Sequence, residues 1–139
     1  MVQIISGTNG KGKSSYLLDS ANKAIKDAHG DIVFIDKSSS KMHDLSNKIR
    51  LIDMSAYPIA NYDNFIGYIY GVISQNYDLE KIYIDNFIKV SCADKNIMGH
   101  ALVDIQKISD MRGIDFFLGI SMDAADLPEA AKSMDIVAL

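Results

Sequence analysis

Short apolar runs alternate with longer segments of mixed polarity along the chain. The runs occupy residues 2–6, 32–35, 49–52, 82–84, 116–120 and 136–138. Because they are short and rich in Ile, Val and Phe, they predict buried strands rather than helices. The alternation predicts an α/β fold, a three-layer α/β/α sandwich with a mainly parallel sheet between two layers of helices.

Helices are predicted in the segments between these runs. After the first strand, Leu17 and Ala21 fall on one helical face, and we expect that helix to end at Gly30 in the left-handed conformation. Further helices are predicted around residues 65–73 and from about Asp94 onward. The connections between successive strands are therefore expected to be helical.

Two segments add detail to this pattern. Residues 36–48 are polar and predict a loop or an irregular helix. Further on, Asp126 resembles a helix cap, Pro128 is tolerated in a first turn, and Glu129 stands at the third helical position. These three residues predict one more helix before the last strand.

The composition indicates an ordinary globular domain. The chain has 139 residues, of which 48% are hydrophobic and 23% charged, and we expect one domain over residues 1–139. The net charge of -4 argues against a surface built mainly to neutralise nucleic-acid phosphates, although it leaves room for a local basic patch. Nucleic-acid binding is therefore not the first expectation.

Neither a signal peptide nor a membrane span is predicted. No basic amino-terminal region precedes a long apolar run, and no eighteen uncharged apolar residues follow one another. The single cysteine, Cys92, excludes an internal disulfide and fits a reducing compartment. We expect a cytoplasmic location.

The stretch GTNGKGKS at residues 7–14 matches the phosphate-loop pattern G-x-x-x-x-G-K-[ST], between a predicted strand and a predicted helix. Glycines let backbone N–H groups converge on phosphate oxygens, and the helix amino terminus adds partial positive charge. A plain glycine-rich turn is the alternative, and the strand and helix on either side favour the phosphate loop. The predicted nucleotide-binding residues are Gly7, Thr8, Asn9, Gly10, Lys11, Gly12, Lys13, Ser14 and Ser15.

Individual side chains of this loop carry specific expectations. Lys13 is expected to bridge the terminal phosphates and so to take part in catalysis, and Ser14 is expected to ligate Mg²⁺. Asp85 ends the run at residues 82–84 and is the expected second metal ligand, because Mg²⁺ needs hard oxygen donors. Its alternative is a strand-end Asp that starts a turn. Ser121 ends the next strand and is expected either to sense the terminal phosphate or only to close the strand.

The order of these features resembles the RecA-like branch of P-loop ATPases, which includes recombinases, ring helicases and KaiC-type ATPases. The resemblance rests on the phosphate loop, the strand "DIVFID", the Walker B-like "IYIDNF", the strand "FFLGIS" and the closing "SMDIVAL". It implies a minimal RecA-like domain in which ATP and Mg²⁺ are bound and the Walker B aspartate is Asp85.

The resemblance also implies a water-activating Glu just past the second strand, and this chain has none there. The sequence reads Asp36-Lys37-Ser38-Ser39 at that place. Asp36 either substitutes as the general base or merely starts the loop. Slow hydrolysis is therefore expected.

Arginine is scarce, which bears on the reaction class. Only Arg50 and Arg112 occur, so the Arg-rich lid of a nucleoside-monophosphate kinase is not expected. In RecA-like ATPases a cationic finger commonly comes from a neighbouring subunit. The finger is thus expected from Arg112, from Lys132, or from a protein partner or second copy in a homo-oligomer.

Other polar clusters have weaker interpretations. The lysine-rich segment 37–48 is interpreted as a solvated loop rather than a contact for an anionic partner, and the three histidines lack zinc-site spacing. No Asn-Lys-x-Asp guanine-reading motif occurs, which favours ATP over GTP. Three hypotheses follow: a slow Mg²⁺-dependent ATPase that binds ATP and ADP, a non-catalytic nucleotide-binding module, or a DNA-associated motor.

Overall fold

All six strands belong to one parallel sheet in the computed structural model, which describes residues 1–139. The sheet order is β3-β2-β4-β5-β1-β6, so strands far apart in the sequence become neighbours. The α/β fold with a parallel sheet is confirmed. The strands are β1 (Val2–Ser6), β2 (Asp31–Asp36), β3 (Arg50–Asp53), β4 (Leu79–Ile84), β5 (Asp115–Ile120) and β6 (Asp135–Ala138).

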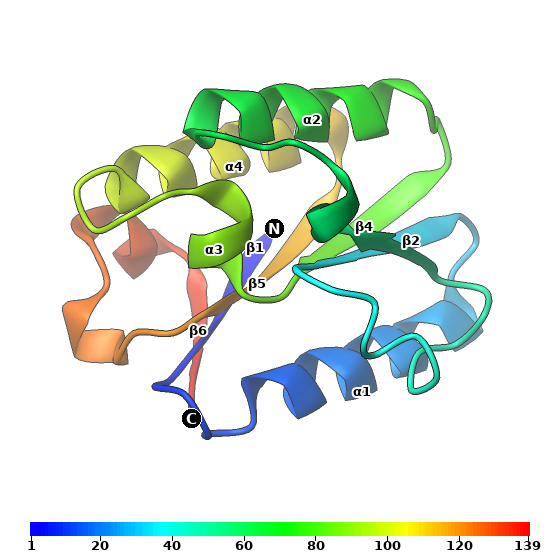
Figure 1. Ribbon diagram of the computed structural model, residues 1–139, viewed down its shortest axis with the longest axis horizontal. Coiled ribbons are helices and arrows are strands. Elements are labelled where there is room, and N and C mark those ends of the chain that lie inside the picture. The colour runs from blue at the N-terminus through cyan, green and yellow to red at the C-terminus, as the bar shows by residue number, and fades with distance from the viewer.

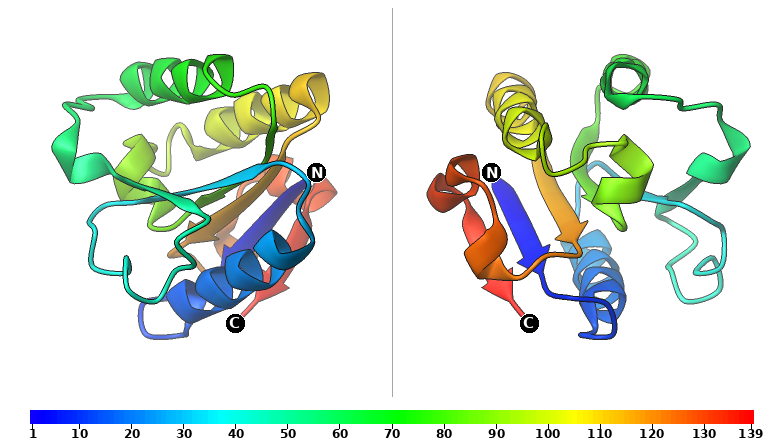
Figure 2. Two further views of the ribbon diagram at one scale, coloured as in Figure 1. Left: turned by 90° about the vertical axis from the view of Figure 1, so that its right-hand side faces the viewer. Right: turned by 60° about the vertical axis from the view of Figure 1, so that its left-hand side comes forward.

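Helices cover both faces of this sheet (Figure 1). Helix α1 (Lys13–Asp27) lies on one face, whereas α2 (Tyr62–Ser74), the short α3 (Phe87–Ser91) and α4 (Met98–Arg112) lie on the other. The two further views show the same separation (Figure 2). The sheet thus forms the middle layer of a three-layer sandwich, as the alternating pattern predicts.

Two apolar cores fill the spaces between the layers. The larger has 26 buried residues between the sheet and the α2–α4 layer. The smaller has nine and lies under α1, where the rings of Tyr83 and Phe117 stack with centroids 4.3 Å apart. Leu45 and Ile49, which follow β2 in the chain, are buried in this smaller core. The loop after β2 is therefore anchored at its far end.

The prediction that a left-handed Gly30 ends the first helix is wrong. Helix α1 ends at Asp27 with Ala28 as its cap, and Gly30 is not among the residues of positive φ. Glycine is needed at position 30 for space, because an added Cβ would lie 1.9 Å from the carbonyl oxygen of Asp78. The left-handed glycine at a helix end is Gly113, after α4.

Two other helix boundaries differ from the prediction. Asp94 does not begin α4, since its side chain accepts from the amides of Asn96 and Ile97 in a turn that precedes the helix. Asp126 is not a cap either, because the segment after it forms a 3₁₀ turn, Glu129–Ser133, with no side-chain cap bond. The short helix α3 was not predicted.

The carboxyl ends of the strands place the residues of interest at one edge of the sheet. The loop after β1, Asp36 at the end of β2, Asp85 after β4 and Ser121 after β5 meet there because parallel strands all point the same way. None of the helices combines the length and the apolar character that crossing a bilayer requires.

Candidate functional site

The loop between β1 and α1 depends on two glycines in the left-handed region. Gly10 has φ 86° and Gly12 has φ 89°. A Cβ added at either position would meet nothing within 4 Å, so the backbone conformation rather than lack of space requires glycine there. Most other residues could adopt the backbone conformation of this loop only with strain.

The amino end of α1 is left without a local cap. Gly12 precedes the helix and supplies no side chain to its first-turn amides, and the first turn has no acidic residue. Helix amino termini carry about half a positive charge through such amides. This end of the helix is thus suited to an anion.

A cavity of about 370 Å³ opens at this helix end and has no apolar residue in its lining. Gly7 is buried and Thr8 and Lys11 are exposed, and these three predicted loop residues do not line the cavity. Six predicted loop residues do line it, together with two side chains predicted from later strands and Asn86. The lining residues are Asn9, Gly10, Gly12, Lys13, Ser14, Ser15, Asp85, Asn86 and Ser121.

Lys13 is held across the loop rather than extended into solvent. Its side chain is buried, with the residue 8% exposed, and its Nζ donates to the carbonyl oxygen of Thr8 at 3.2 Å. Its ammonium group therefore contributes positive charge at the loop itself.

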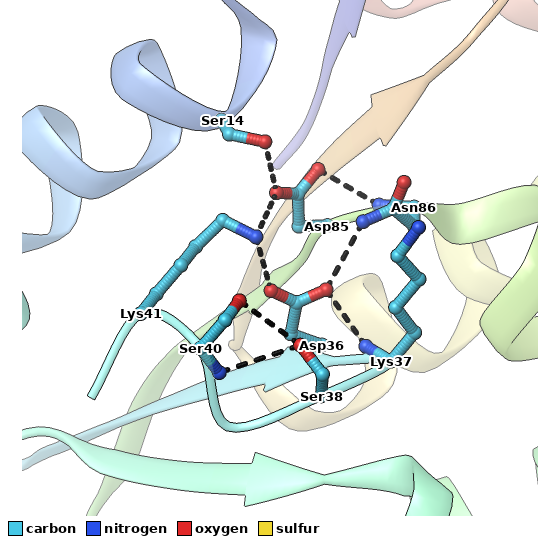
Figure 3. Close-up of polar contacts among 8 residues, drawn as sticks. All are labelled: Ser14, Asp36, Lys37, Ser38, Ser40, Lys41, Asp85 and Asn86. Atoms are coloured by element: carbon cyan, nitrogen blue, oxygen red, sulfur yellow. Dashed lines mark hydrogen bonds and ion pairs between the residues drawn. The ribbon is translucent and has the colours of Figure 1, made fainter.

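Ser14 and Asp85 meet across the edge of the sheet, as the close-up shows (Figure 3). The Ser14 hydroxyl donates to Oδ2 of Asp85 at 2.6 Å, and Oδ1 of Asp85 accepts from the backbone N–H of Asn86 at 2.8 Å. Asp85 is 2% exposed. The two residues expected to bind the metal are thus in direct contact.

Asp36 is fully buried beside Asp85 and has several partners. Its Oδ1 accepts from the backbone N–H of Lys37 at 2.7 Å and from Nδ2 of Asn86 at 3.0 Å. Its Oδ2 pairs with the ammonium of Lys41. Each carboxylate oxygen of Asp36 is therefore already in contact with at least one N–H donor of the protein.

Lys41 joins the two carboxylates. Besides Asp36, its Nζ contacts Oδ2 of Asp85 at 3.2 Å. Burial opposes a charged ammonium, but the hydrogen bond and negative charge of Asp36, with those of Asp85, outweigh it and raise the pKa of Lys41 above its ordinary value. Lys41 is consequently a fixed positive charge at this site.

Ser121 lies on the wall of the same cavity. Its hydroxyl donates to Oδ1 of Asn9 in the loop at 3.2 Å. The end of β5 is thereby tied to the phosphate-loop motif, at the position where a sensor of the terminal phosphate was expected.

The expected finger residues do not reach this cavity in their own chain. Arg112 lines a different cavity with Tyr70, Tyr77 and Met111, where α4 ends and β5 begins. Lys132 is 72% exposed and pairs with Glu129 at 2.8 Å. Arg112 and Lys132 therefore contribute no charge to the site within one molecule.

Two other lysines lie closer. Lys37 and Lys89 line a cavity of about 260 Å³ that shares Asn9, Asn86 and Ser121 with the loop cavity. In the close-up the side chain of Lys37 extends alongside Asn86 (Figure 3). The segment at residues 37–48 thus supplies Lys37 and Lys41 to the site, whereas the sequence pattern indicated only a solvated loop.

The donor set at this edge suits a hard divalent cation. The Ser14 hydroxyl and the carboxylates of Asp36 and Asp85 are oxygen donors of the kind that Mg²⁺ prefers. No group of three or more His, Cys, Asp or Glu side chains could hold a metal ion by itself. An ion here would therefore need further ligands from outside the protein to complete its shell.

Comparisons with known proteins identify the fold. No family model and no curated protein sequence matches the chain. The crystal structure of the flagellar accessory protein FlaH from Methanocaldococcus jannaschii is similar, with a TM-score of 0.58 and 11% sequence identity over 95% of this chain. This chain spans 65% of the length of that one. The likeness, with the six-stranded parallel sheet, supports the RecA-like α/β fold.

Proposed function

We propose that this protein binds ATP with Mg²⁺ and hydrolyses it slowly. The observation that carries the proposal is the 2.6 Å contact between Ser14, at the start of α1, and Asp85, after β4. It joins a glycine loop suited to phosphate with a buried carboxylate suited to Mg²⁺. The fold similarity is compatible with this proposal.

Each residue of the site has a role in the proposal. The loop amides and the Lys13 ammonium would hold the phosphates, and Ser14 and Asp85 would hold Mg²⁺. Bound Mg²⁺ neutralises charge on the phosphates during transfer. Ser121 and its partner Asn9, which also line the cavity, would contact the terminal phosphate.

Slow turnover follows from the state of Asp36. A general base needs a free oxygen lone pair aimed at the attacking water. The oxygens of Asp36 already accept from Lys37, Asn86 and Lys41. Neither oxygen of Asp36 is therefore free of a donor for the attacking water until Lys41 leaves it.

Cations for the terminal phosphate are available within the chain. Lys37 and Lys89 line the cavity next to the loop, so they would supply the cation that the sequence led us to expect from Arg112, from Lys132 or from another protein. A second copy of the chain or a partner protein would supply a further cation for faster turnover.

A non-catalytic nucleotide-binding module is the second candidate. The three donors that already contact Asp36 favour it, because a site without a working base would retain the nucleotide. Phosphate release by the purified protein separates the two candidates, since only the ATPase produces phosphate beyond one equivalent per site.

Lys13→Ala tests the phosphate loop itself. We expect at least a tenfold loss of ATP affinity, about 1.4 kcal/mol, because a charge-assisted bond to phosphate is removed. Binding is measured by calorimetric titration of ATP and GTP, with and without Mg²⁺. Lys23→Ala, an exposed lysine on the same helix, is the control and should bind like the wild type. Unchanged ATP affinity in Lys13→Ala would show that the loop is not the nucleotide site.

A further inference from the structure

Lys41 is the cation that pairs with two buried carboxylates, those of Asp36 and Asp85. Asp36 is 0% and Asp85 2% exposed, and the side chain of Lys41 is itself only 16% exposed. Two carboxylates that contact the same ammonium lie close together, and in a site away from water their negative charges repel strongly. The ammonium of Lys41 is therefore a structural requirement of the site as it stands.

The ammonium of Lys41 also lies where a divalent ion bound to Asp85 would lie. Oδ2 of Asp85 accepts from the Ser14 hydroxyl at 2.6 Å and contacts Nζ of Lys41 at 3.2 Å. The same carboxylate oxygen thus meets both the expected metal ligand Ser14 and the ammonium (Figure 3). A divalent ion held by Ser14 and Asp85 would occupy the space next to this oxygen that Lys41 now uses.

The segment that carries Lys41 can move without disturbing the core. Residues 39–44 are exposed except for the half-buried Lys41. The anchor lies further on, where Asn22 of α1 donates to the carbonyl oxygen of Asp44 and accepts from the amide of Ser46, and Leu45 is buried. Departure of Lys41 from Asp36 and Asp85 therefore breaks two ion pairs and no apolar packing.

We propose that Lys41 is a built-in cation that competes with the divalent ion for Asp85 while it also pairs with Asp36. Loading of the ion displaces the ammonium from Asp85 and frees an oxygen of Asp36, so Lys41 sets both the divalent-ion affinity and the availability of the base. The inference rests on the proposed function in that Ser14 and Asp85 hold the ion. It adds a residue that determines how tightly they hold it.

Lys41→Met tests the competition without any nucleotide. Binding of Mn²⁺ alone is followed by electron paramagnetic resonance, and thermal unfolding is followed with and without Mg²⁺. We expect Mn²⁺ to bind at least tenfold more tightly than to the wild type. Without an ion the variant should unfold at least roughly 5 °C lower, because one partner of a buried ion pair is lost, and Mg²⁺ should restore most of that shift.

Two variants serve as controls. Lys48→Met removes an exposed lysine of the same segment and should match the wild type in both measurements. The double variant Lys41→Met with Asp36→Asn removes one positive and one negative charge, so the net charge of the cluster is unchanged. It tests the competition even if Lys41→Met alone fails to fold. We expect it to bind Mn²⁺ more tightly than the wild type.

The outcomes are decisive for the competition. If neither variant that lacks Lys41 gains Mn²⁺ affinity, or if Mg²⁺ stabilises the wild type and Lys41→Met equally, the inference is wrong. Its failure is distinguishable from failure of the proposed function. If Lys13→Ala loses ATP binding but Lys41→Met gains no Mn²⁺ affinity, the proposed function stands and the competition is wrong. If Lys41→Met gains Mn²⁺ affinity but the wild type does not bind ATP, the competition stands and the proposed function is wrong.

Discussion

Buried polar side chains in this protein are held by specific partners. Asp36, Asp85 and Lys13 all have bonding partners, and Ser6 Oγ is the one buried side-chain oxygen or nitrogen without a hydrogen bond. Burying a polar group without a partner costs roughly 1–3 kcal/mol, and a charged group costs more. Substitutions at these positions should therefore act on stability as well as on binding.

Tyr62 gives a residue-scale prediction about pH. Burial, followed by the hydrogen bond that its hydroxyl donates to Asp104 at 2.7 Å, raises the pKa of Tyr62 well above its ordinary value. The phenol of the unfolded chain ionises near pH 10 while the folded one stays protonated, so the stability from this group is complete below pH 10 and is lost as the pH rises further.

Tyr62→Phe should remove this dependence. At pH 8 we expect a loss of about 1 kcal/mol of unfolding free energy, since one hydrogen bond is removed. Between pH 10 and 11 the gap to the wild type should narrow, as measured by urea unfolding. Tyr77→Phe, at a fully exposed position, should track the wild type throughout. A constant gap would contradict the raised pKa.

Some residues of the site were predictable from the sequence and others were not. Asp36 and Asp85 follow apolar runs, and parallel strands bring their carboxyl ends together, so a local pattern sufficed. Lys41 pairs with Asp85 across 44 positions of the chain, and only the adjacency of β2 and β4 creates that contact. Asn86 likewise reaches Asp36 because those strands are neighbours.

At the scale of elements, the start of α1 depends on Gly12. A residue with a Cβ pays roughly 1–2 kcal/mol in the left-handed conformation. Gly12→Ala should therefore lower the unfolding free energy by about that amount and weaken ATP binding. Gly67→Ala provides a matched control, since Gly67 lies in the exposed interior of α2 with no neighbour within 4 Å of an added Cβ. It should gain about 0.5–1 kcal/mol. Equal effects in urea unfolding would contradict the argument.

Elements with a strong period were predicted correctly, and those set by local hydrogen bonds were not. Each of the six strands contains short apolar stretches, which report burial directly. Asp126 was expected to cap a helix and Asp94 to begin one, yet Asp94 closes a turn before α4 and Asp126 lies in a 3₁₀ turn. A capping pattern alone does not specify how many residues of helix follow it.

At the scale of the whole molecule, the two edges of the sheet are chemically different. The carboxyl edge holds the glycine loop and the buried charges. The opposite edge holds the cavity lined by Tyr70, Tyr77, Met111 and Arg112. A ligand at one edge is therefore readily told from a ligand at the other.

Hydrogen exchange should show which edge binds ATP with Mg²⁺. We expect slower exchange in residues 7–15, by up to about 100-fold at a nucleotide concentration 100 times Kd. The carboxyl end of α4 should change far less. Protection confined to α4 and the turn around Tyr77 would place the ligand at the wrong edge and refute the assignment. Mass spectrometry of peptic fragments resolves these segments.

The position of Leu139, which follows β6 in the chain, matters when this protein is attached to a surface or a dye. The amide of Leu139 donates to the carbonyl oxygen of Ser6 at 2.9 Å, and an added Cβ at Gly7 would lie 3.4 Å from Leu139. A linker fused there would crowd the glycine loop. A label on an exposed side chain of α2, on the sheet face opposite α1, would leave that loop clear.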